Sequence, residues 1–276
     1  LNLCGDAWVK GAFHSYGGSC ELSLVEGVMG LFDGIGSSSR GSTAAVAHWL
    51  GLPVILVVDA GGQAASLGAL VRGFRDHDPQ LNLAGVVLNR VSSQRHQDLL
   101  ADVLDSMGMP LLGCLPRSDL LSLPSRHLGL APAHELAHAK QQCAAWASLA
   151  EEHLDLKNLA PLLKAPEPGP NPLGDRIANH SGELPVAVAS DAAFHFRYAE
   201  TAELLERNGM PIVGWSPLSD EPIPEQARGL ILPGGFPEQH AAQLSSCNRS
   251  LRSLRQFVAQ RPVYAECGGM LLLGQQ

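Results

Sequence analysis

Two carboxylates and three glycines stand close together near the start of the chain, in the run V-E-G-V-M-G-L-F-D-G over residues 25–34. The apolar residues within 22–25 predict the end of a buried strand of a parallel sheet. Glu26 then lies at the carboxyl edge of that sheet, where open α/β sheets bind ligands, and Asp33 returns a second acid to the same loop. Such a loop favours Mg²⁺, which takes one or two carboxylates together with phosphate oxygens. A solvated surface loop is the alternative that this spacing leaves open.

A cysteine near the other end of the chain has the sequence context of a nucleophile. Residues 262–266 predict a short strand that runs directly into Cys267, which two glycines and an apolar stretch follow. A nucleophile between a strand and a helix has the elbow geometry of α/β hydrolytic sites, and a helix N-terminus favours its thiolate. A second glycine loop, L-P-G-G-F-P-E over residues 232–238, can aim backbone N–H groups at an oxyanion. A buried structural cysteine is the alternative reading.

Histidines offer two further kinds of chemistry. A cysteine hydrolase needs a general base, and His180, His195 and His240 are the candidates upstream of Cys267, although nothing in their context marks a triad. The segment H-E-L-A-H over residues 134–138 has the zinc-peptidase form H-E-x-x-H. It lies near the linker, and the third ligand that it needs could come from His153 or Glu152 only if the helix bent sharply. A solvated helical turn is therefore the favoured interpretation of this segment.

The elements that must position these residues alternate between strands and helices. Buried strands are predicted at 53–58, 84–88, 110–114, 185–189, 229–232 and 262–265. Helices are predicted at 42–50, 66–75, 94–107 and 198–208, with a longer one from about 134 to 156. This alternation indicates parallel sheets with helices on both faces. The segment 165–183 carries four prolines without periodicity, which predicts a linker between two α/β domains.

Composition excludes several classes of protein. The chain has 276 residues and a net charge of −8, with no basic stripe for nucleic acid. It has neither an apolar run of membrane-spanning length nor a signal-peptide pattern. The six cysteines are scattered without a C-x-x-C pair, so neither a disulfide framework nor a zinc ribbon is indicated. We therefore expect a cytoplasmic protein that binds neither nucleic acid nor membrane; a homodimer is one state that the sequence allows.

Several motifs together resemble those of one enzyme family. Beside V-E-G-V-M-G-L-F-D-G and L-P-G-G-F-P-E, they are S-T-A-A-V-A-H-W-L-G-L-P-V-I-L-V-V-D-A, G-V-V-L-N-R-V, L-P-S-R-H-L-G-L and Y-A-E-C-G-G-M. In this order, and over nearly the whole chain, the motifs resemble the cobyrinic acid a,c-diamide synthase family. The members of this family act in the synthesis of the corrin ring of vitamin B12.

The resemblance implies an α/β fold with two doubly wound, mostly parallel-sheet domains, both truncated. Residues 1–164 would be an ATP-dependent synthetase domain of the P-loop type, similar to dethiobiotin synthetase. Residues 165–183 would be the linker, and residues 184–276 a flavodoxin-like class I glutamine amidotransferase domain. The implied reaction is amidation of the a and c carboxylates of cobyrinic acid in cobalamin biosynthesis. It uses glutamine, Mg²⁺ and ATP and proceeds through an acyl phosphate.

The resemblance also assigns roles by position. In the first domain Glu26 matches the acid that helps to hold Mg²⁺, and Asp33 the acid tied to the phosphorylation step. Cys267 matches the nucleophile that forms a glutamyl thioester. Gly235 and Gly268 are the expected oxyanion donors.

The nucleotide pocket is expected at the ends of later strands. Asn89 matches the position that reads the adenine edge of ATP in related synthetases, and Pro116 and Arg117 would line the same pocket. Asp59 fits a helix-capping or structural role as well as a catalytic one. Arg126 and His127 fit either loop packing or contact with phosphate or with a substrate carboxylate.

The sequence departs from the family pattern at both ends. It contains no G-x-x-x-x-G-K-[ST] motif, and the family's catalytic histidine would follow Gln276. The interpretation is a fragment of an enzyme that is inactive by itself. Three alternatives remain: the same chemistry on hydrogenobyrinic acid or another tetrapyrrole, a partition-type nucleotide-binding module fused to an amidotransferase-like domain, and the metallopeptidase. An intact Cys267 disfavours the non-enzymatic module.

Overall fold

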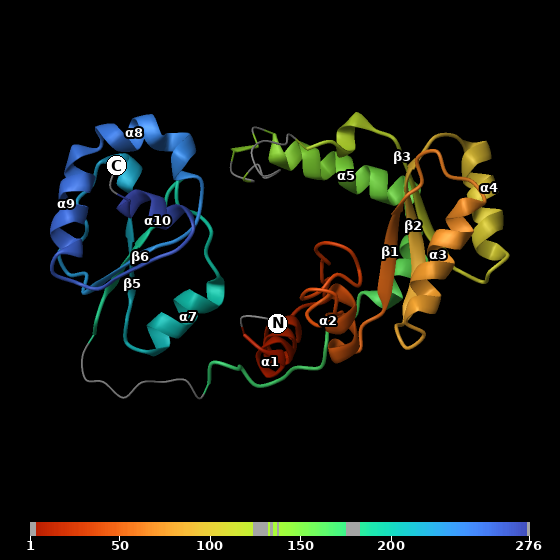
Figure 1. The fold of residues 1–276 in the computed structure, drawn as a ribbon, viewed down its shortest axis with the longest axis horizontal. Coiled ribbons are helices and arrows are strands. Elements are labelled where there is room, and N and C mark those ends of the chain that lie inside the picture. Colours follow the sequence, from red (N-terminus) through yellow and green to blue (C-terminus); the bar gives the residue numbers. More distant parts are fainter. Residues whose placement is uncertain (1–3, 124–131, 133–134, 137, 175–182, 275–276) are drawn as a thin grey trace. The chain divides into compact units, whose positions relative to one another are not determined.

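The computed structural model describes residues 4–123, 132, 135, 136, 138–174 and 183–274. These residues form two compact units, Leu1–Pro172 and Leu173–Gln276 (Figure 1). Both units are α/β, with one parallel sheet each, as the sequence predicts. None of the helices in the described part of the chain has the length and apolar character needed to span a bilayer.

The sheet of the first unit contains three parallel strands in the order β1-β2-β3. Their bounds are Val54–Asp59, Leu83–Val91 and Leu111–Pro116. Because the strands are parallel, all three carboxyl ends reach the same edge. Asp59 stands in register with Asn89 at that edge, and Val91 with Pro116.

Helices cover both faces of this sheet. The helices α3 (Ser66–His77) and α4 (Gln94–Asp105) pack on one face through a core that includes Leu67, Leu88 and Leu100. The other face is covered where α5 (Ala139–His153) leads into α6 (Leu156–Leu159) and η4 (Ala160–Leu162), and there Val87, Leu112 and Leu159 form a smaller core. Figure 1 shows α3 and α4 on the opposite side of the strands from α5.

The predicted strand at residues 22–25 is not formed. This segment follows α1 (Asp6–Gly17), has no regular structure and is solvent-exposed, Leu24 being 74% exposed. The physical reason is the lack of a partner: among the described strands β1 pairs only with β2, and no backbone ladder reaches residues 22–25. The chain re-enters regular structure at α2 (Thr43–Leu50), which Ser42 caps by accepting a hydrogen bond from the amide of Ala45.

The first half of the predicted linker is packed rather than free. Residues 166–172 run along α1, where the carbonyl of Glu167 contacts Nδ1 of His14 at 2.8 Å and the amide of Gly169 donates to the carbonyl of His14. A Cβ on Gly11 would lie 3.1 Å from Cβ of Pro172, so small residues on α1 allow this close approach. The segment therefore belongs to the first unit as far as Pro172.

The sheet of the second unit has four parallel strands in the order β5-β4-β6-β7. In chain order their bounds are β4 Val186–Ala189, β5 Ile212–Trp215, β6 Gly229–Leu232 and β7 Val263–Ala265. The central strand β4 is buried at every residue, and its continuous apolar run V-A-V-A is typical of a strand covered on both faces.

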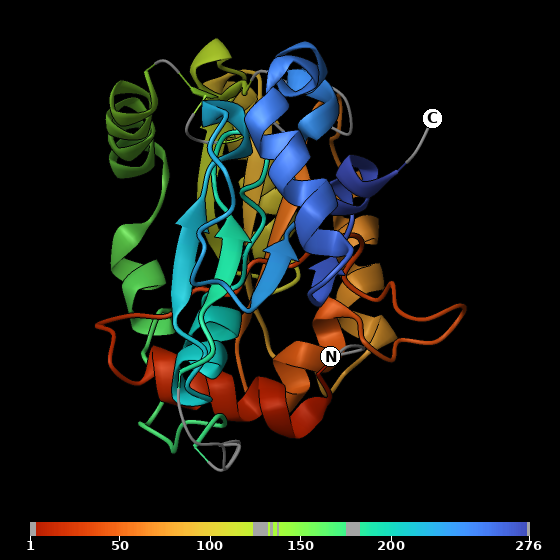
Figure 2. The same ribbon diagram turned by 90° about the vertical axis from the view of Figure 1, so that its left-hand side faces the viewer.

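The helices of this unit complete its core. They are α7 (Ala199–Arg207), η5 (Pro217–Ser219), η6 (Pro237–His240), α8 (Ala241–Ser246), α9 (Asn248–Val258) and α10 (Gly268–Leu273). Leu244 of α8 and Leu254 and Phe257 of α9 pack with Trp215 and Phe194 in one buried cluster. Figure 2 shows α8 and α9, in blue, against the strands of this unit.

Candidate active site

The sharpest backbone feature of the second unit is the turn at Cys267. This residue lies between β7 and α10, directly before the helix, with φ 47° and ψ −121°, a conformation that costs a residue with a Cβ about 1–3 kcal/mol. The thiol-bearing residue is exposed, so the elbow predicted from the sequence is formed and its cysteine is not sealed in the core. Hydrogen bonds fix the backbone around it: the amide of Glu266 donates to the carbonyl of Leu232, and the amide of Gly269 donates to the carbonyl of Glu266.

The two residues after the nucleophile must be glycines for steric reasons. A Cβ on Gly269 would lie 2.1 Å from the carbonyl oxygen of Leu232, and a Cβ on Gly268 would lie 2.7 Å from that of Gly235. Both distances are far below van der Waals contact. The missing side chains let α10 start directly against the end of β6, which keeps the nucleophile beside the loop that follows β6.

That loop carries Gly235, one of the two predicted oxyanion donors; the other, Gly268, is the first residue of α10. Gly235 has φ 155°, and a Cβ there would lie 2.1 Å from the carbonyl oxygen of Ala193. The amides of His195 and Phe196 both donate to the carbonyl of Gly234, which fixes the loop. In the described part of the chain the amides of Gly235 and Gly268 have no hydrogen-bond acceptor. The backbones of Gly235 and Gly268 are in contact beside Cys267, so both residues predicted to bind a developing oxyanion lie next to the nucleophile.

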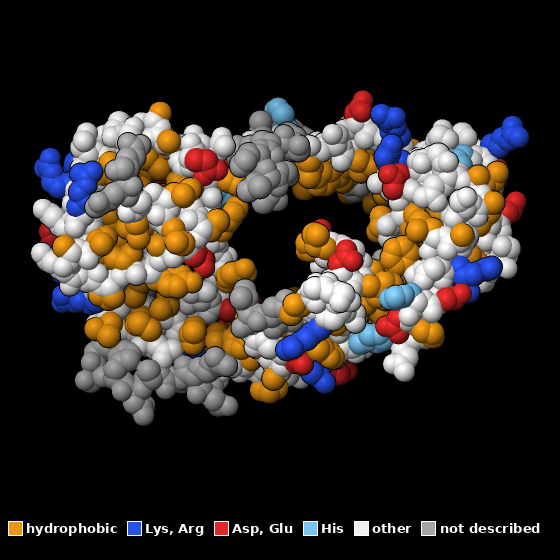
Figure 3. Space-filling view, in the orientation of Figure 1, with side chains coloured by type: hydrophobic (Ala, Val, Ile, Leu, Met, Phe, Trp, Pro, Cys, Tyr) orange, Lys and Arg blue, Asp and Glu red, His pale blue; other side chains and the backbone are white. Residues whose placement is uncertain are grey.

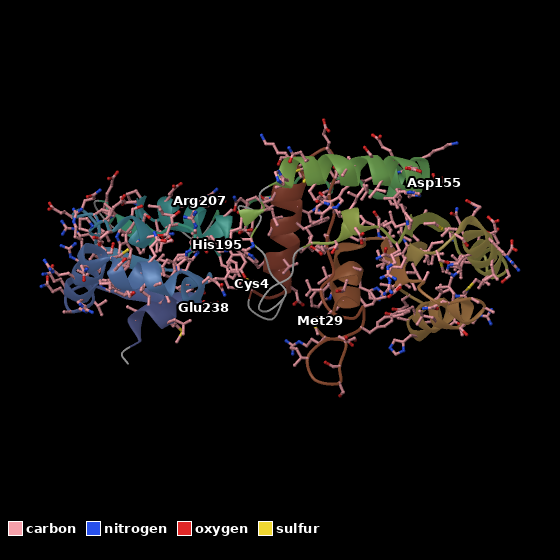
Figure 4. All side chains as sticks on the ribbon, turned by 90° about the horizontal axis from the view of Figure 1, so that it is seen from above. Cys4, Met29, Asp155, His195, Arg207 and Glu238 are labelled. Carbon is pink, nitrogen blue, oxygen red and sulfur yellow. The ribbon has the colours of Figure 1, made fainter. Side chains whose placement is uncertain are left out.

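Aromatic rings line one side of the nucleophile. Phe196 meets His195 and Phe236 edge to face, with ring centroids 4.7 Å and 5.2 Å apart. A Cβ on Gly234 would lie 3.2 Å from Phe196 and 3.4 Å from Cβ of Cys267, so Phe196 and the nucleophile flank the same glycine. Figure 4 shows His195, from the loop before α7, and Glu238, from η6, at one end of this unit.

Exposed apolar side chains continue around the turn. Met270 and Leu271 of α10 are 61% and 64% exposed, and Tyr264 of β7 and Tyr198 are also open to solvent. Figure 3 shows hydrophobic side chains gathered on the face of this unit that carries α10. The Tyr264 hydroxyl donates to Glu266 at 3.1 Å, and this hydrogen bond raises the pKa of Tyr264.

The candidate bases have different surroundings. Nδ1 of His195 contacts the carbonyl of Ala192 at 3.1 Å, within its own turn. Nε2 of His240 is buried and has no hydrogen-bond partner among the described residues. His180 lies outside the described residues. Neither His195 nor His240 is therefore assigned as the base of Cys267.

The six thiols should react with iodoacetamide in an order set by burial. Burial raises the pKa of Cys114, so its thiolate fraction grows only at higher pH than that of an ordinary cysteine. Cys267 is exposed and should be alkylated at pH 7 at least about ten-fold faster than Cys114. Peptide mapping by mass spectrometry measures both rates. Faster labelling of Cys114 in the folded chain would contradict the described burial, and denatured protein, in which the difference should vanish, is the control.

The carboxyl edge of the first sheet brings together most of the predicted nucleotide-binding residues. Asn89 lies near the carboxyl end of β2, Pro116 ends the neighbouring strand β3, and exposed Arg117 follows directly. The structure adds an ion pair that the sequence did not predict: Nη1 of Arg90 donates to Oδ2 of Asp59 at 2.8 Å. Nothing in the sequence signals this contact, because it depends on a positive φ of 63° at Arg90.

Glu26 and Asp33 are not at this edge. Their loop is anchored by Phe32, whose ring lies 6.0 Å from that of Phe74 and 4.5 Å from that of His77. These two residues are in the last turn of α3, which runs antiparallel to the strands, so the anchor is at the amino-terminal end of the sheet. The expectation that Glu26 ends a strand at the carboxyl edge is therefore wrong for the described structure.

The loop still offers carboxylate oxygens to a cation. Glu26 is exposed, and Asp33 is exposed with Oδ2 accepting the amide of Gly30 at 3.0 Å. Met29, at φ 67°, lies on the same loop (Figure 4). The described residues contain no group of three or more metal-ligating side chains. A site with one or two carboxylates can bind Mg²⁺ only where phosphate oxygens and water complete the coordination shell, as they usually do for this ion.

The zinc-peptidase pattern finds no support. Helix α5 begins at Ala139, and His138 stands before it with φ −129° and ψ 33°, so the motif does not form a continuous helical turn that ends at His138. His134 lies outside the described residues, as do Arg126 and His127. The metallopeptidase alternative is therefore not carried further.

Comparisons with known proteins match the two units to two domain families. Residues 185–276 match the profile of a CobB/CobQ-like glutamine amidotransferase domain, and residues 9–125 match that of an AAA domain. No solved structure matches the chain.

Curated relatives match over almost the whole chain. Cobyrinate a,c-diamide synthases of Synechococcus and Gloeobacter violaceus are 39% and 41% identical, over 99% and 100% of this chain. A hydrogenobyrinate a,c-diamide synthase of Streptomyces coelicolor is 40% identical over 98% of it. The chain spans 61%, 61% and 63% of the length of these three relatives.

Proposed function

Because the chain belongs to the family of cobyrinate a,c-diamide synthases, we propose that the protein that carries it is a glutamine-dependent ligase. It converts the a and c carboxylates of cobyrinic acid into amides, with ATP as the source of activation. The observation that carries this proposal is the strained turn at Cys267, with the Gly235 backbone beside it. A packing role gives no reason for an exposed cysteine in such a conformation, whereas a nucleophile needs it.

The second unit supplies ammonia. The Cys267 thiolate attacks the carboxamide carbon of glutamine, and the carbonyl electrons move onto oxygen, where the amides of Gly235 and Gly268 stabilise the negative charge. Collapse of this intermediate breaks the C–N bond, and the nitrogen takes up a proton as ammonia leaves. Water then hydrolyses the glutamyl thioester, which gives glutamate and restores the thiol.

The first unit activates the acid. A carboxylate oxygen of the corrin attacks the γ-phosphorus of ATP, so that ADP leaves and an acyl phosphate forms. Ammonia attacks the acyl carbon, and inorganic phosphate leaves as the amide forms. Asn89, Pro116 and Arg117, at and just after the carboxyl edge, are the residues that we assign to the nucleotide. The loop that carries Glu26 and Asp33 lies at the other end of the sheet, so their proposed roles, Mg²⁺ binding by Glu26 and a part in phosphorylation for Asp33, require that loop to move to the nucleotide. Mg²⁺ held there would offset charge on the transferred phosphoryl group.

The identity of the tetrapyrrole has a second candidate. Relatives named for hydrogenobyrinate are 39% and 40% identical to the chain, which is within the range of those named for cobyrinate. Overall identity therefore does not distinguish the cobalt-containing acid from the metal-free one. Both are offered as substrates in the test below.

The test is an amidation assay with glutamine labelled with ¹⁵N at the amide. The protein that carries this chain is incubated with ATP, Mg²⁺ and either cobyrinic or hydrogenobyrinic acid. We expect two labelled amides in the preferred product by mass spectrometry, with one ADP for each. An absence of label in both products, in the presence of an active reference enzyme, would contradict the proposed function.

A further inference from the structure

The backbone at Arg90 is held in a conformation that side chains rarely adopt. Arg90 has φ 63°, and it is the residue directly after Asn89 on β2. The Oδ1 atom of Asn89 accepts the Arg90 amide at 2.9 Å, which stabilises this bend. A left-handed residue inside a strand costs free energy, and such strain is concentrated at functional sites. The bend occurs at the carboxyl edge of the sheet, where α/β folds bind ligands.

The bend places the Arg90 guanidinium group across the end of β1. Its Nη1 donates to Oδ2 of Asp59 at 2.8 Å, and the amide of Gly61 donates to Oδ1 of the same carboxylate at 2.9 Å. A Cβ on Gly61 would lie 3.4 Å from Cζ and 3.5 Å from Nε of Arg90. The guanidinium group therefore lies beside the bare Cα of Gly61. About half of each charged side chain, 52% for Arg90 and 57% for Asp59, stays open to solvent.

Hydrogen bonds from Gln63 and His96 hold the loop that follows Asp59. The side-chain amide of Gln63 donates to the backbone carbonyl of Asp59 at 2.9 Å. Nε2 of His96, on α4, contacts the carbonyl of Gln63 at 2.8 Å, and Nδ1 of His96 accepts the amide of Ser92. Ala60, whose amide donates to Asn89, is fully buried. Such a network keeps the position of the ion pair fixed relative to Asn89.

The charges of the pair decide what it can bind. The Asp59 carboxylate offsets the positive charge of Arg90, and a phosphate that approached the guanidinium group would meet that carboxylate too. A neutral flat ring meets no such repulsion. Guanidinium groups stack well on aromatic faces because they are planar and weakly hydrated, and an Arg side chain already fixed by a carboxylate loses little rotamer freedom on stacking.

We propose that Arg90, held by Asp59 across Gly61, is the stacking platform for the purine base of the nucleotide. Asn89 lies next to it and presents its side-chain amide to the edge of the same base. The inference rests on the proposed use of ATP and adds Arg90 and Asp59, as stacking and positioning residues, to the expected pocket residues.

The test compares Arg90→Lys with the wild type in the full-length protein. Lysine keeps the charge and the pair with Asp59 but removes the planar group. We expect the KM for ATP to rise roughly ten-fold, with kcat within about two-fold, because a stacked base contributes binding alone. GTP should lose affinity as much as ATP does, since every purine has a flat face. Arg95→Lys, on an exposed arginine of α4, is the matched control and should change neither value.

Two further measurements keep the inference falsifiable. Tripolyphosphate, which lacks a base, should inhibit the wild type and Arg90→Lys equally; a large loss of inhibition in the variant would show that Arg90 binds phosphate and would overturn the proposal. Gly61→Ala should reproduce the KM effect, because its Cβ would lie only 3.0 Å from Oδ1 of Asp59 and would displace the carboxylate that holds Arg90. A thermal unfolding midpoint checks that this variant folds.

Failures of the two proposals are distinguishable. A wild-type protein that neither binds ATP nor amidates a corrin overturns the proposed function and this inference with it. An active wild type, with unchanged ATP KM in both Arg90→Lys and Gly61→Ala, leaves the function intact and overturns the role of Arg90. Ammonia release from glutamine by the second unit serves as the internal control and should stay at the wild-type rate in both variants.

Discussion

Replacement of Cys267 by alanine should abolish the use of glutamine while the use of free ammonia survives. The exposed thiol at the β7–α10 turn is the assigned nucleophile, so its removal should lower glutamine-dependent amidation by at least about 10³-fold. Ammonia from an added ammonium salt bypasses the second unit and should restore turnover to within about five-fold of the wild type. Paired assays with glutamine and with ammonium chloride measure both rates.

A matched variant separates the nucleophile from other thiols. Cys143→Ala removes an exposed cysteine from α5 and should leave both activities unchanged. Glutamine-dependent turnover that persists in Cys267→Ala would show that another group cleaves glutamine, and the role of the β7–α10 turn would have to be abandoned.

Replacement of Gly235 by alanine should destabilise the second unit and also remove its activity. The new Cβ would lie 2.1 Å from the carbonyl oxygen of Ala193, at a φ of 155° that disfavours any side chain. The loop must move away from the turn at Ala193 to relieve this overlap, at a cost of about 3 kcal/mol in the free energy of unfolding. The same movement withdraws the Gly235 amide from Cys267. Urea denaturation and a glutamine hydrolysis assay measure the two effects.

Gly214→Ala is the control for this steric effect. Gly214 lies on β5 in the same unit, and a Cβ there would meet nothing within 4 Å. We expect a change in stability within about 1 kcal/mol and full hydrolytic activity. Equal stability of Gly235→Ala and the wild type would mean that the loop is not held against Ala193 as described.

The strand β1 could be predicted from its long apolar run, whereas β5 could not be predicted from the sequence. The run P-V-I-L-V-V-D gives β1 directly, because a strand covered on both faces needs apolar side chains throughout. By contrast β5 has the sequence I-V-G-W, where a glycine interrupts a very short run, and no strand was predicted there. Its position in the sheet comes from pairing with β4, which is a tertiary effect.

The sequence pattern around each residue also explains why the Cys267 turn was predicted, whereas helix α9 and the bend at Arg90 were not. Helix α9 was not predicted, although Leu251, Leu254 and Phe257 recur at helical spacing, because the arginines between them obscure the apolar periodicity.

The Cys267 turn could be predicted, since glycines at fixed positions mark it. The bend at Arg90 could not, because it results from the side chain of its neighbour Asn89 and from packing over Gly61.

The edge strand β1 should make the isolated chain prone to associate with other molecules. Among the described strands it pairs only with β2, and Val57 on it is 64% exposed, so an apolar strand presents open N–H and C=O groups to solvent. Proteins normally cover or interrupt such edge strands, since an extended segment of another molecule can pair with them by backbone hydrogen bonds. Concentrated solutions of the separate chain should therefore form intermolecular β-structure, and a short peptide that caps β1 should keep it dispersed.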